Sequence, residues 1–183
     1  MSDAPRIGRL DTVVARERPD LVGPTVTAAL GAAPALAAYV AEIVPALADT
    51  AAFCEAYEVP PELSANCVVV AGRRGGDERV AACLVLATTR ADVNGVVRRR
   101  LDVRKASFLA MDRAVELTGM EYGGITPLGL PGDWPVFVDA AVAALPFVVV
   151  GSGVRRSKLL VSGDGLAALP RAEVVPGLGV PAS

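Results

Sequence analysis

The stretch that decides the fold is Thr118-Gly119-Met120-Glu121-Tyr122-Gly123-Gly124-Ile125-Thr126-Pro127-Leu128-Gly129, a glycine-rich loop in a chain of 183 residues without histidine. Glycine lacks a Cβ atom, so a loop of this kind can present bare backbone amides to a ligand. The absence of histidine removes the commonest general base. Any chemistry therefore depends on backbone groups, carboxylates, hydroxyls or the substrate itself.

The composition predicts a single domain with a core of small aliphatic residues. A chain of this length can bury a sizeable core but is short for two domains. Hydrophobic residues make up 52% of the sequence and aromatic residues only 4%, which leaves alanine, valine and leucine to fill the core. The net charge of -2 argues against broad, non-specific binding to nucleic acid.

The apolar stretch 28–48 is interpreted as short buried helices and not as a membrane span, because its bulk is alanine, which contributes little to membrane insertion. Polar or helix-breaking residues interrupt it at Gly31, Pro34, Glu42 and Pro45. The N-terminus carries Arg6 and Arg9 with no continuous apolar region after them, unlike a secretory signal. We therefore expect a cytoplasmic protein without membrane association.

The three cysteines, Cys54, Cys67 and Cys83, are expected to be reduced and buried. Their number is odd, their surroundings are apolar and none forms a CxxC pair, so neither a disulfide framework nor a zinc site is indicated. A catalytic cysteine would need a group that stabilises its thiolate, and no histidine is available for that role. We expect no metal and no organic cofactor.

The middle and end of the chain alternate short strands with short helices. Two apolar runs, 67–71 and 79–87, flank a glycine-containing turn and predict a hairpin buried on both faces. Further strands are expected at 136–138, 147–150, 158–161 and 172–175. The pattern predicts an α+β domain with a mixed, partly barrel-like sheet flanked by helices.

Capping residues mark the predicted helices. Asp49 and Thr50 begin one that runs to residue 57, and Asp92 begins another. A helix over 112–117 ends at Gly119, where glycine suits a left-handed C-cap. A last short helix is expected at 166–169.

The order of these segments resembles the YbaK/EbsC family, whose YbaK/prolyl-tRNA synthetase-associated domain occurs in freestanding aminoacyl-tRNA deacylases and as the editing insertion of bacterial prolyl-tRNA synthetases. The most specific part is the loop 118–129, which is similar to the family's TGxxxGGxxPxG motif. Supporting pieces are Leu101-Asp102-Val103-Arg104-Lys105, similar to an LDxKK segment, Asp139 at a strand end, and Gly151-Ser152-Gly153. The resemblance implies an N-terminal helical extension at 1–48, an editing-like domain at 49–176 and a tail at 177–183.

The resemblance also implies a site in which backbone groups and the substrate's own groups do the chemistry. An aminoacyl-tRNA ester is already activated, so a pocket with a positioned water and donors for the oxyanion is sufficient. The residues expected to act on the ester are Asn66, Gly123, Gly124, Asp139 and Ser152. Those expected to bind the substrate are Thr126, Pro127, Gly151, Gly153, Lys105 and Arg155.

Asn66 stands where editing members of the family carry a lysine. Its amide can donate a hydrogen bond to a phosphate or ester oxygen but brings no charge. The only lysines in the chain are Lys105 and Lys158, so no lysine that neighbours Asn66 in the sequence can stand in locally for the missing one. A different substrate, binding through arginines elsewhere and loss of activity all remain open.

Several of the predicted site residues have a purely structural alternative. Gly123 and Gly124 can form a tight turn, Asp139 can cap a helix, and Ser152 can be a turn residue between glycines. Thr126 precedes a proline and can serve only to shape the loop.

Basic residues gather in two places. Between residues 90 and 113, seven basic residues stand against three acidic ones, and Arg155, Arg156 and Lys158 form a smaller cluster. Positive charge near a glycine loop suits a ligand with phosphates, such as the acceptor end of a tRNA. A solvated helix face is the alternative.

Three functions follow from these observations. The first is a deacylase that hydrolyses the ester of mischarged aminoacyl-tRNA in trans, with a synthetase as a further partner. The second is a non-catalytic binding module for aminoacyl-tRNA or a related aminoacyl compound, which Asn66 in place of lysine favours. The third is an interaction domain whose alanine-rich N-terminal helices dock a partner.

Overall fold

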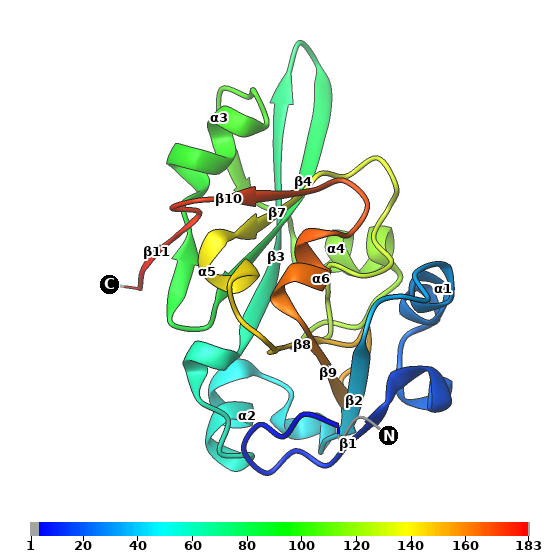
Figure 1. Cartoon of the computed structure of the whole chain (residues 1–183). Coiled ribbons are helices and arrows are strands. Elements are labelled where there is room, and N and C mark those ends of the chain that lie inside the picture. Colours follow the sequence, from blue (N-terminus) through cyan, green and yellow to red (C-terminus); the bar gives the residue numbers. More distant parts are fainter. Residues whose placement is uncertain (1–3, 183) are drawn as a thin grey trace.

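Two β-sheets carry the fold (Figure 1). In the computed structural model, which describes residues 4–182, the five-stranded sheet contains, in spatial order, β10 (Ala172–Val175), β7 (Val136–Asp139), β4 (Asp77–Leu86), β3 (Ala65–Arg74) and β6 (Ala106–Phe108). The four-stranded sheet contains β1 (Thr12–Val14), β2 (Ala38–Glu42), β9 (Ser157–Val161) and β8 (Val148–Gly151). A small sheet pairs β5 (Thr89–Ala91) with β11 (Gly179–Pro181).

Short helices connect the strands, and α5 and α6 pack together in front of the sheets in Figure 1. The α-helices of the described residues are α1 (Pro24–Ala32), α2 (Thr50–Ala56), α3 (Arg98–Arg100), α4 (Met111–Thr118), α5 (Ala140–Ala143) and α6 (Gly163–Ala167). Single turns of other helix types occur at Ala15–Glu17, Pro19–Leu21, Pro45–Leu47, Pro61–Leu63 and Val93–Val97. Within residues 4–182, every helix is too short or too polar to cross a membrane.

The five-stranded sheet is mixed, as predicted. β3 and β4 pair antiparallel in a hairpin, whereas β7 runs parallel to both β4 and β10. The hairpin turns at Gly75 and Gly76, whose φ angles of 59° and 92° are left-handed and favour glycine. A parallel bridge between Ser64 and Val149 joins this sheet to the four-stranded one. The predicted α+β class and the predicted hairpin are confirmed.

The core consists mainly of valine, leucine and alanine, as the composition predicts. One buried cluster includes Val40, Leu84, Val138 and Leu159, all fully buried. These four side chains come from β2, β4, β7 and β9, and therefore from both sheets. Removing such apolar surface from water is the main favourable term in folding, so this shared layer holds the two sheets together.

The stretch 28–48 differs from the prediction in its second half. Its first half contains helix α1, but residues 38–42 form strand β2, which pairs antiparallel with β9. Pro34 is incompatible with a continuing helix, and Tyr39 and Val40 favour a strand. The expected pair of helices is therefore wrong, because β2 is an interior strand of the four-stranded sheet.

Arg16 fixes the path of the chain between α1 and β2. Its guanidinium donates hydrogen bonds to the carbonyls of Leu30 at 3.1 Å and Leu36 at 2.9 Å. Carbonyls in the last turn of a helix lack hydrogen-bond partners inside the helix. A side chain that donates hydrogen bonds to them therefore stabilises the turn. The arginine thus compensates for the absence of a glycine cap after α1.

Two of the other helix ends have the predicted caps. Gly119 ends α4 with a φ of 67°, and the Asp92 carboxylate accepts hydrogen bonds from the amides of Gly95 and Val96 at 3.0 Å each. α2 begins at Thr50 as predicted, although the Asp49 side chain makes no capping hydrogen bond. α6 begins earlier than predicted, at Gly163, because the side chain of Ser162 caps it.

Both ends of the chain contribute strands. Residues 1–3 of the predicted extension and residue 183 of the predicted tail lie outside the described residues. Within the described part, β1 and β2 share a sheet with β8 and β9, and β11 pairs with β5. The N-terminal segment is thus not purely helical, and within its sheet β2 is flanked by β1 on one side and β9 on the other.

The position of β2 makes a test of the fold possible. Val40 is fully buried, whereas Val44, just after the strand, is 53% exposed. We expect Val40→Ala to lower the free energy of unfolding by about 2 kcal/mol and the matched control Val44→Ala by less than about 0.5 kcal/mol. Urea denaturation followed by circular dichroism measures both values. Equal losses in the two variants would show that β2 does not lie in the core.

Candidate functional site

A cavity of about 330 Å³ brings together part of the predicted site. It lies between the start of α2, the start of β3, the glycine loop and the β8–β9 hairpin. Three predicted site residues, Asn66, Gly123 and Gly151, line it. The other lining residues are Ala48, Asp49, Thr50, Ala65, Cys67, Val68, Tyr122, Ile125 and Lys158.

Asn66 is held in place by α2. The hydroxyl of Thr50, at the start of that helix, donates a hydrogen bond of 2.6 Å to Asn66 Oδ1. Because this bond uses the carbonyl oxygen, the amide NH₂ group of Asn66 is the part that can donate to a ligand. The contact therefore orients a neutral donor at the cavity wall.

Lys158, on β9, lies in the same cavity as Asn66, although no lysine neighbours Asn66 in the sequence. Its side chain is 8% exposed, and Nζ donates to the carbonyl of Ala48 at 2.8 Å and contacts the carbonyl of Gly123 at 3.5 Å. Nζ also lies 5.3 Å from the centroid of the Phe53 ring, a favourable position for a cation. The cavity thus has a positive charge from a different strand.

Burial and, to a smaller extent, the positive charge of Arg155 together lower the pKa of Lys158 from its ordinary 10.5 to about 8. Removing an ammonium from water disfavours its charged form, and the two carbonyl contacts offset this cost of burial only in part. Near neutral pH the group is mainly an ammonium that gives up its proton more readily than an exposed lysine. An ammonium has three hydrogens, so two carbonyl partners leave one for a ligand.

The loop reaches the cavity through Gly123, whose φ of 80° is left-handed. A Cβ atom at this position would lie 2.4 Å from Nη1 of Arg155. Arg155 donates to the carbonyls of Pro45 and Tyr122 at 3.2 Å each and pairs with Asp49 at 3.4 Å. The arginine therefore ties the loop to the segment before α2, and the left-handed φ of Gly123 favours glycine at the contact.

The neighbouring glycines hold the loop together. Gly124 N donates to Glu121 O at 2.9 Å, and Gly153 N donates to Gly124 O at 2.7 Å. Both amides are thus engaged within the protein. Gly123 N, in contrast, has no acceptor among the described residues, so this amide is free to donate to a ligand.

Ser152 and Asp139 occupy structural positions away from the cavity lining. Ser152 is fully buried, and its hydroxyl contacts the carbonyls of Val154 at 3.1 Å and Ser157 at 3.0 Å. Asp139 caps α5 through Ala141 N at 3.0 Å and accepts from Gly179 N at 2.5 Å. These contacts match the structural alternatives that the sequence left open for both residues.

The remaining predicted residues also lie outside this cavity. Thr126 is fully buried, and Pro127 lines a separate, mostly apolar cavity of about 270 Å³ beside Trp134. Gly153 lies against Gly23, and Lys105 lines a groove elsewhere on the surface. Their predicted roles in substrate binding therefore stay predictions, because none of these residues lines the cavity that contains Asn66.

The cysteines are free, as expected. Cys67 lines the cavity, but burial raises the pKa of its thiol far above the ordinary range, and the nearby Cys83 raises it further. A thiol in this state is protonated and a poor nucleophile. The cavity therefore offers hydrogen-bond donors and a positive charge but no activated side-chain nucleophile.

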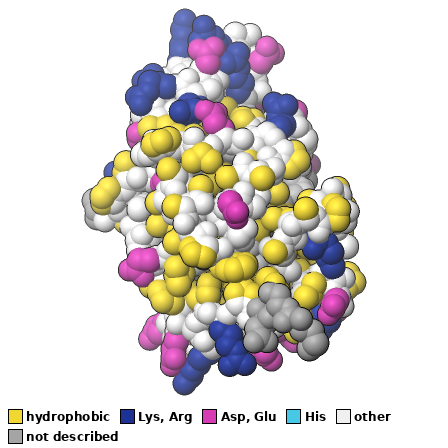
Figure 2. All heavy atoms as spheres, viewed as in Figure 1, with side chains coloured by type: hydrophobic (Ala, Val, Ile, Leu, Met, Phe, Trp, Pro, Cys, Tyr) yellow, Lys and Arg dark blue, Asp and Glu magenta, His cyan; other side chains and the backbone are white. Residues whose placement is uncertain are grey.

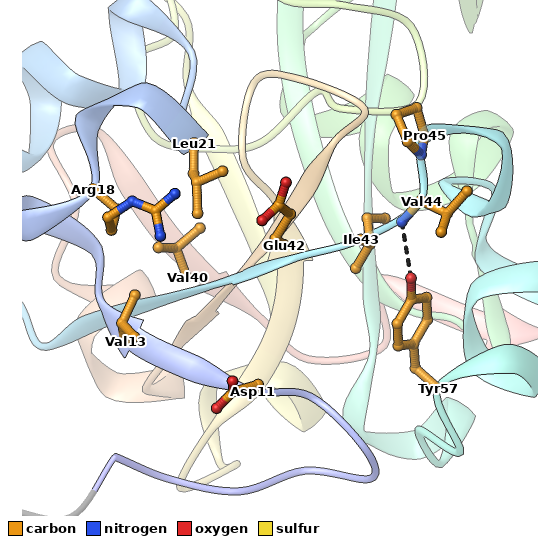
Figure 3. Close-up of a pocket in the computed structure, with 10 residues that line it drawn as sticks. All are labelled: Asp11, Val13, Arg18, Leu21, Val40, Glu42, Ile43, Val44, Pro45 and Tyr57. Carbon is orange, nitrogen blue, oxygen red and sulfur yellow. Dashed lines mark hydrogen bonds between the residues drawn. The ribbon is translucent and has the colours of Figure 1, made fainter.

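A larger cavity of about 560 Å³ lies beside β2 (Figure 3). Figure 3 shows Arg18 and Glu42 facing the same hollow, with the Tyr57 hydroxyl bonded to Val44 N at 2.8 Å. None of the predicted site residues lines it. Size alone therefore does not identify the site. The smaller cavity is the one that contains predicted site residues together with Lys158.

Comparisons with known proteins identify the family and the fold. A family model for the aminoacyl-tRNA editing domain matches residues 44–169, which confirms the resemblance inferred from the loop. A solved structure described as a candidate trans-editing enzyme for prolyl tRNA synthetase has a TM-score of 0.68 and 21% identity, covering 85% of this chain and 97% of its own. The hypothetical protein APE2540 has a TM-score of 0.74 and 20% identity, covering 85% of this chain and 99% of its own. At these identities the two likenesses show the fold alone. No curated protein matches the sequence significantly.

Sequence reasoning missed Lys158, although two signals pointed to it. It is a single charged residue in a strand otherwise made of serine, leucine and valine, and charged residues are rarely buried without a reason. It also follows the Gly-Ser-Gly turn closely, and the hairpin register places it opposite Gly151. A hairpin drawn from the sequence therefore puts Lys158 beside a predicted site residue.

The lowered pKa of Lys158 predicts how stability depends on pH. Between about pH 8 and 10.5 the unfolded chain keeps the lysine proton and the folded chain does not, so stability rises with pH over that window. Relative to Lys158→Met, we expect the wild-type protein to gain about 1–3 kcal/mol of unfolding free energy from pH 8 to 10.5. Denaturant titrations at several pH values measure it. The exposed Lys105→Met is the matched control and should run parallel to wild type, whereas a parallel Lys158→Met curve contradicts the shift.

Proposed function

The chain belongs to the aminoacyl-tRNA editing domain family, and on that premise we propose that it hydrolyses the ester of mischarged aminoacyl-tRNA in trans. The observation that carries this proposal is the cavity that Lys158, Asn66 and Gly123 line together. Potential donors from these three residues surround one small space, and its described lining residues include no activated side-chain nucleophile. Such a site suits an ester, which needs water and charge stabilisation but no covalent intermediate.

In the proposed reaction, water attacks the carbonyl carbon of the aminoacyl ester. A carbon–oxygen bond forms, and the carbonyl oxygen becomes an oxyanion that the free hydrogen of the Lys158 ammonium and the Gly123 amide stabilise. The bond to the ribose oxygen then breaks, and the proton lost by the attacking water ends on that oxygen. The products are the free amino acid and a tRNA with an intact terminal ribose.

The size of the cavity limits what enters it. About 330 Å³ is at the lower end of the range for ligand pockets, which suits an aminoacyl group with its ester and not a folded nucleic acid. Asn66, oriented by Thr50, is proposed to donate to an oxygen beside the ester. The rest of the tRNA then stays outside, along the surface of the protein.

The proposal includes the setting of the reaction. The substrate is a tRNA charged by another protein, so we propose action in the cytoplasm, where charging takes place. A synthetase is the proposed further partner, since one structure of similar fold is described in relation to prolyl tRNA synthetase. Neither a metal nor an organic cofactor has a step in this chemistry.

A panel of mischarged tRNAs tests the activity. We expect release of amino acid from at least one of them, a kcat/KM about 100-fold lower for Lys158→Met, and a smaller loss for Asn66→Ala. Relative to spontaneous hydrolysis, wild-type activity should fall as pH rises through about 8, because Lys158 then loses its proton. The control Arg6→Gln, which changes an exposed residue outside the cavity lining, should keep wild-type kinetics.

The same panel separates the competing functions. No hydrolysis of any tRNA, with tRNA binding intact, contradicts the proposal and supports the non-catalytic binding module. Asn66→Lys adds a second ammonium beside Lys158, so repulsion between like charges predicts no gain in rate. A large gain would instead show that the natural site lacks a functional cation.

A further inference from the structure

A second polar groove, of about 460 Å³, lies away from the cavity, between the end of β3, strand β6 and the start of α4. Four cationic side chains line it: Arg73, Arg104, Lys105 and Arg113. All four are exposed. Figure 2 shows lysine and arginine side chains gathered at the end of the molecule that the β3–β4 hairpin and α3 form.

Most of this positive charge is uncompensated. The one acidic residue in the lining is Glu78, whose carboxylate accepts two hydrogen bonds of 2.9 Å from Arg113. Among the described residues, Arg73, Arg104 and Lys105 form no ion pair. Three unpaired cations in one groove favour a ligand with several negative charges.

The groove also exposes an aromatic ring. Phe108, on the edge strand β6, is 59% exposed, and the hydroxyl-bearing Ser107 precedes it in the same lining. An exposed aromatic ring among cations is the arrangement on which nucleic-acid bases stack while the backbone meets positive charge.

Strand β3 connects the groove to the cavity. Asn66 near its beginning lines the cavity, and Gly72 and Arg73 near its end line the groove. Six residues of strand span about 20 Å. A ligand with its ester in the cavity therefore reaches the groove only if it carries phosphates about 20 Å away, as a tRNA does and an aminoacyl nucleoside does not.

We propose that this groove binds the RNA backbone of the substrate next to its acceptor end, with Arg73, Arg104 and Lys105 on phosphates and Phe108 against a base or ribose. The inference rests on the proposed function for the identity of the RNA. Because the chain has a net negative charge, we expect RNA to bind at this local cluster of cations and not over the whole surface. Contacts to the RNA backbone then favour tRNA as substrate without recognising many of its bases.

Binding of uncharged tRNA tests the groove without hydrolysis. We expect Arg104→Gln/Lys105→Gln to weaken the Kd at least tenfold and to reduce the slope of log K against log salt by about 2, one for each lost phosphate contact. Phe108→Ala should weaken binding about tenfold with the slope unchanged. The matched control removes two exposed charges that do not line the groove, Arg6→Gln/Arg9→Gln, and should bind like wild type.

Kinetics complete the test. The groove variants should lower kcat/KM for aminoacyl-tRNA and leave kcat/KM for aminoacyl-adenosine unchanged. If wild type hydrolyses neither substrate, the proposed function fails, and the binding measurements still decide the groove. Wild-type affinity and salt slope in Arg104→Gln/Lys105→Gln, or an equal loss in the control pair, would overturn the inference.

Discussion

The contact between the glycine loop and the Gly151–Gly153 turn is the constraint on which the site depends. Gly153 N donates to Gly124 O at 2.7 Å, and Glu121 N donates to Gly153 O at 2.9 Å. A Cβ atom on Gly151 would lie 2.6 Å from the carbonyl of Gly124, so the two backbones approach more closely than any other residue allows. This contact brings the loop against the β8–β9 hairpin, and with it Gly123 against Lys158.

The cost of the arrangement falls on Lys158. An ammonium that is removed from water is destabilised, and the carbonyls of Ala48 and Gly123 together with the Phe53 ring offset part of that loss. The lowered pKa of Lys158 reflects the part of this burial cost that its contacts do not offset. Natural proteins break local rules mainly at functional sites, so a buried charge beside a cavity agrees with a functional role. The positive charge beside the cavity therefore comes from Lys158 on β9, whereas Asn66, which lines the cavity from β3, is neutral.

The two proposed regions divide recognition by distance. The cavity is small and has a few directed donors, which suits the reacting ester. The groove at the other end of β3 is open and cationic, which suits a repeating phosphate backbone. A rigid strand between them fixes their separation, so both can contact one extended substrate.

Much of the fold followed from local pattern. The sequence by itself determined the glycine loop, the β3–β4 hairpin, the left-handed cap at Gly119 and the cap at Asp92, because each depends on residues close together in the chain. Alternation of strands and helices also predicted the α+β class. The same local signals misled at residues 38–42, where pairing with β9 overrides an alanine-rich composition that favours a helix.

Tertiary structure alone decided which of the candidate residues share a cavity. Asn66 and Lys158 are distant in the sequence, and only the assembly of the two sheets places both beside Gly123. Likewise, Ser152 and Asp139 carry plausible chemistry in the sequence, but the folded chain satisfies their oxygens with backbone partners. The physical reason is that hydrogen-bond partners and burial belong to the folded surroundings of a side chain, which local sequence does not contain.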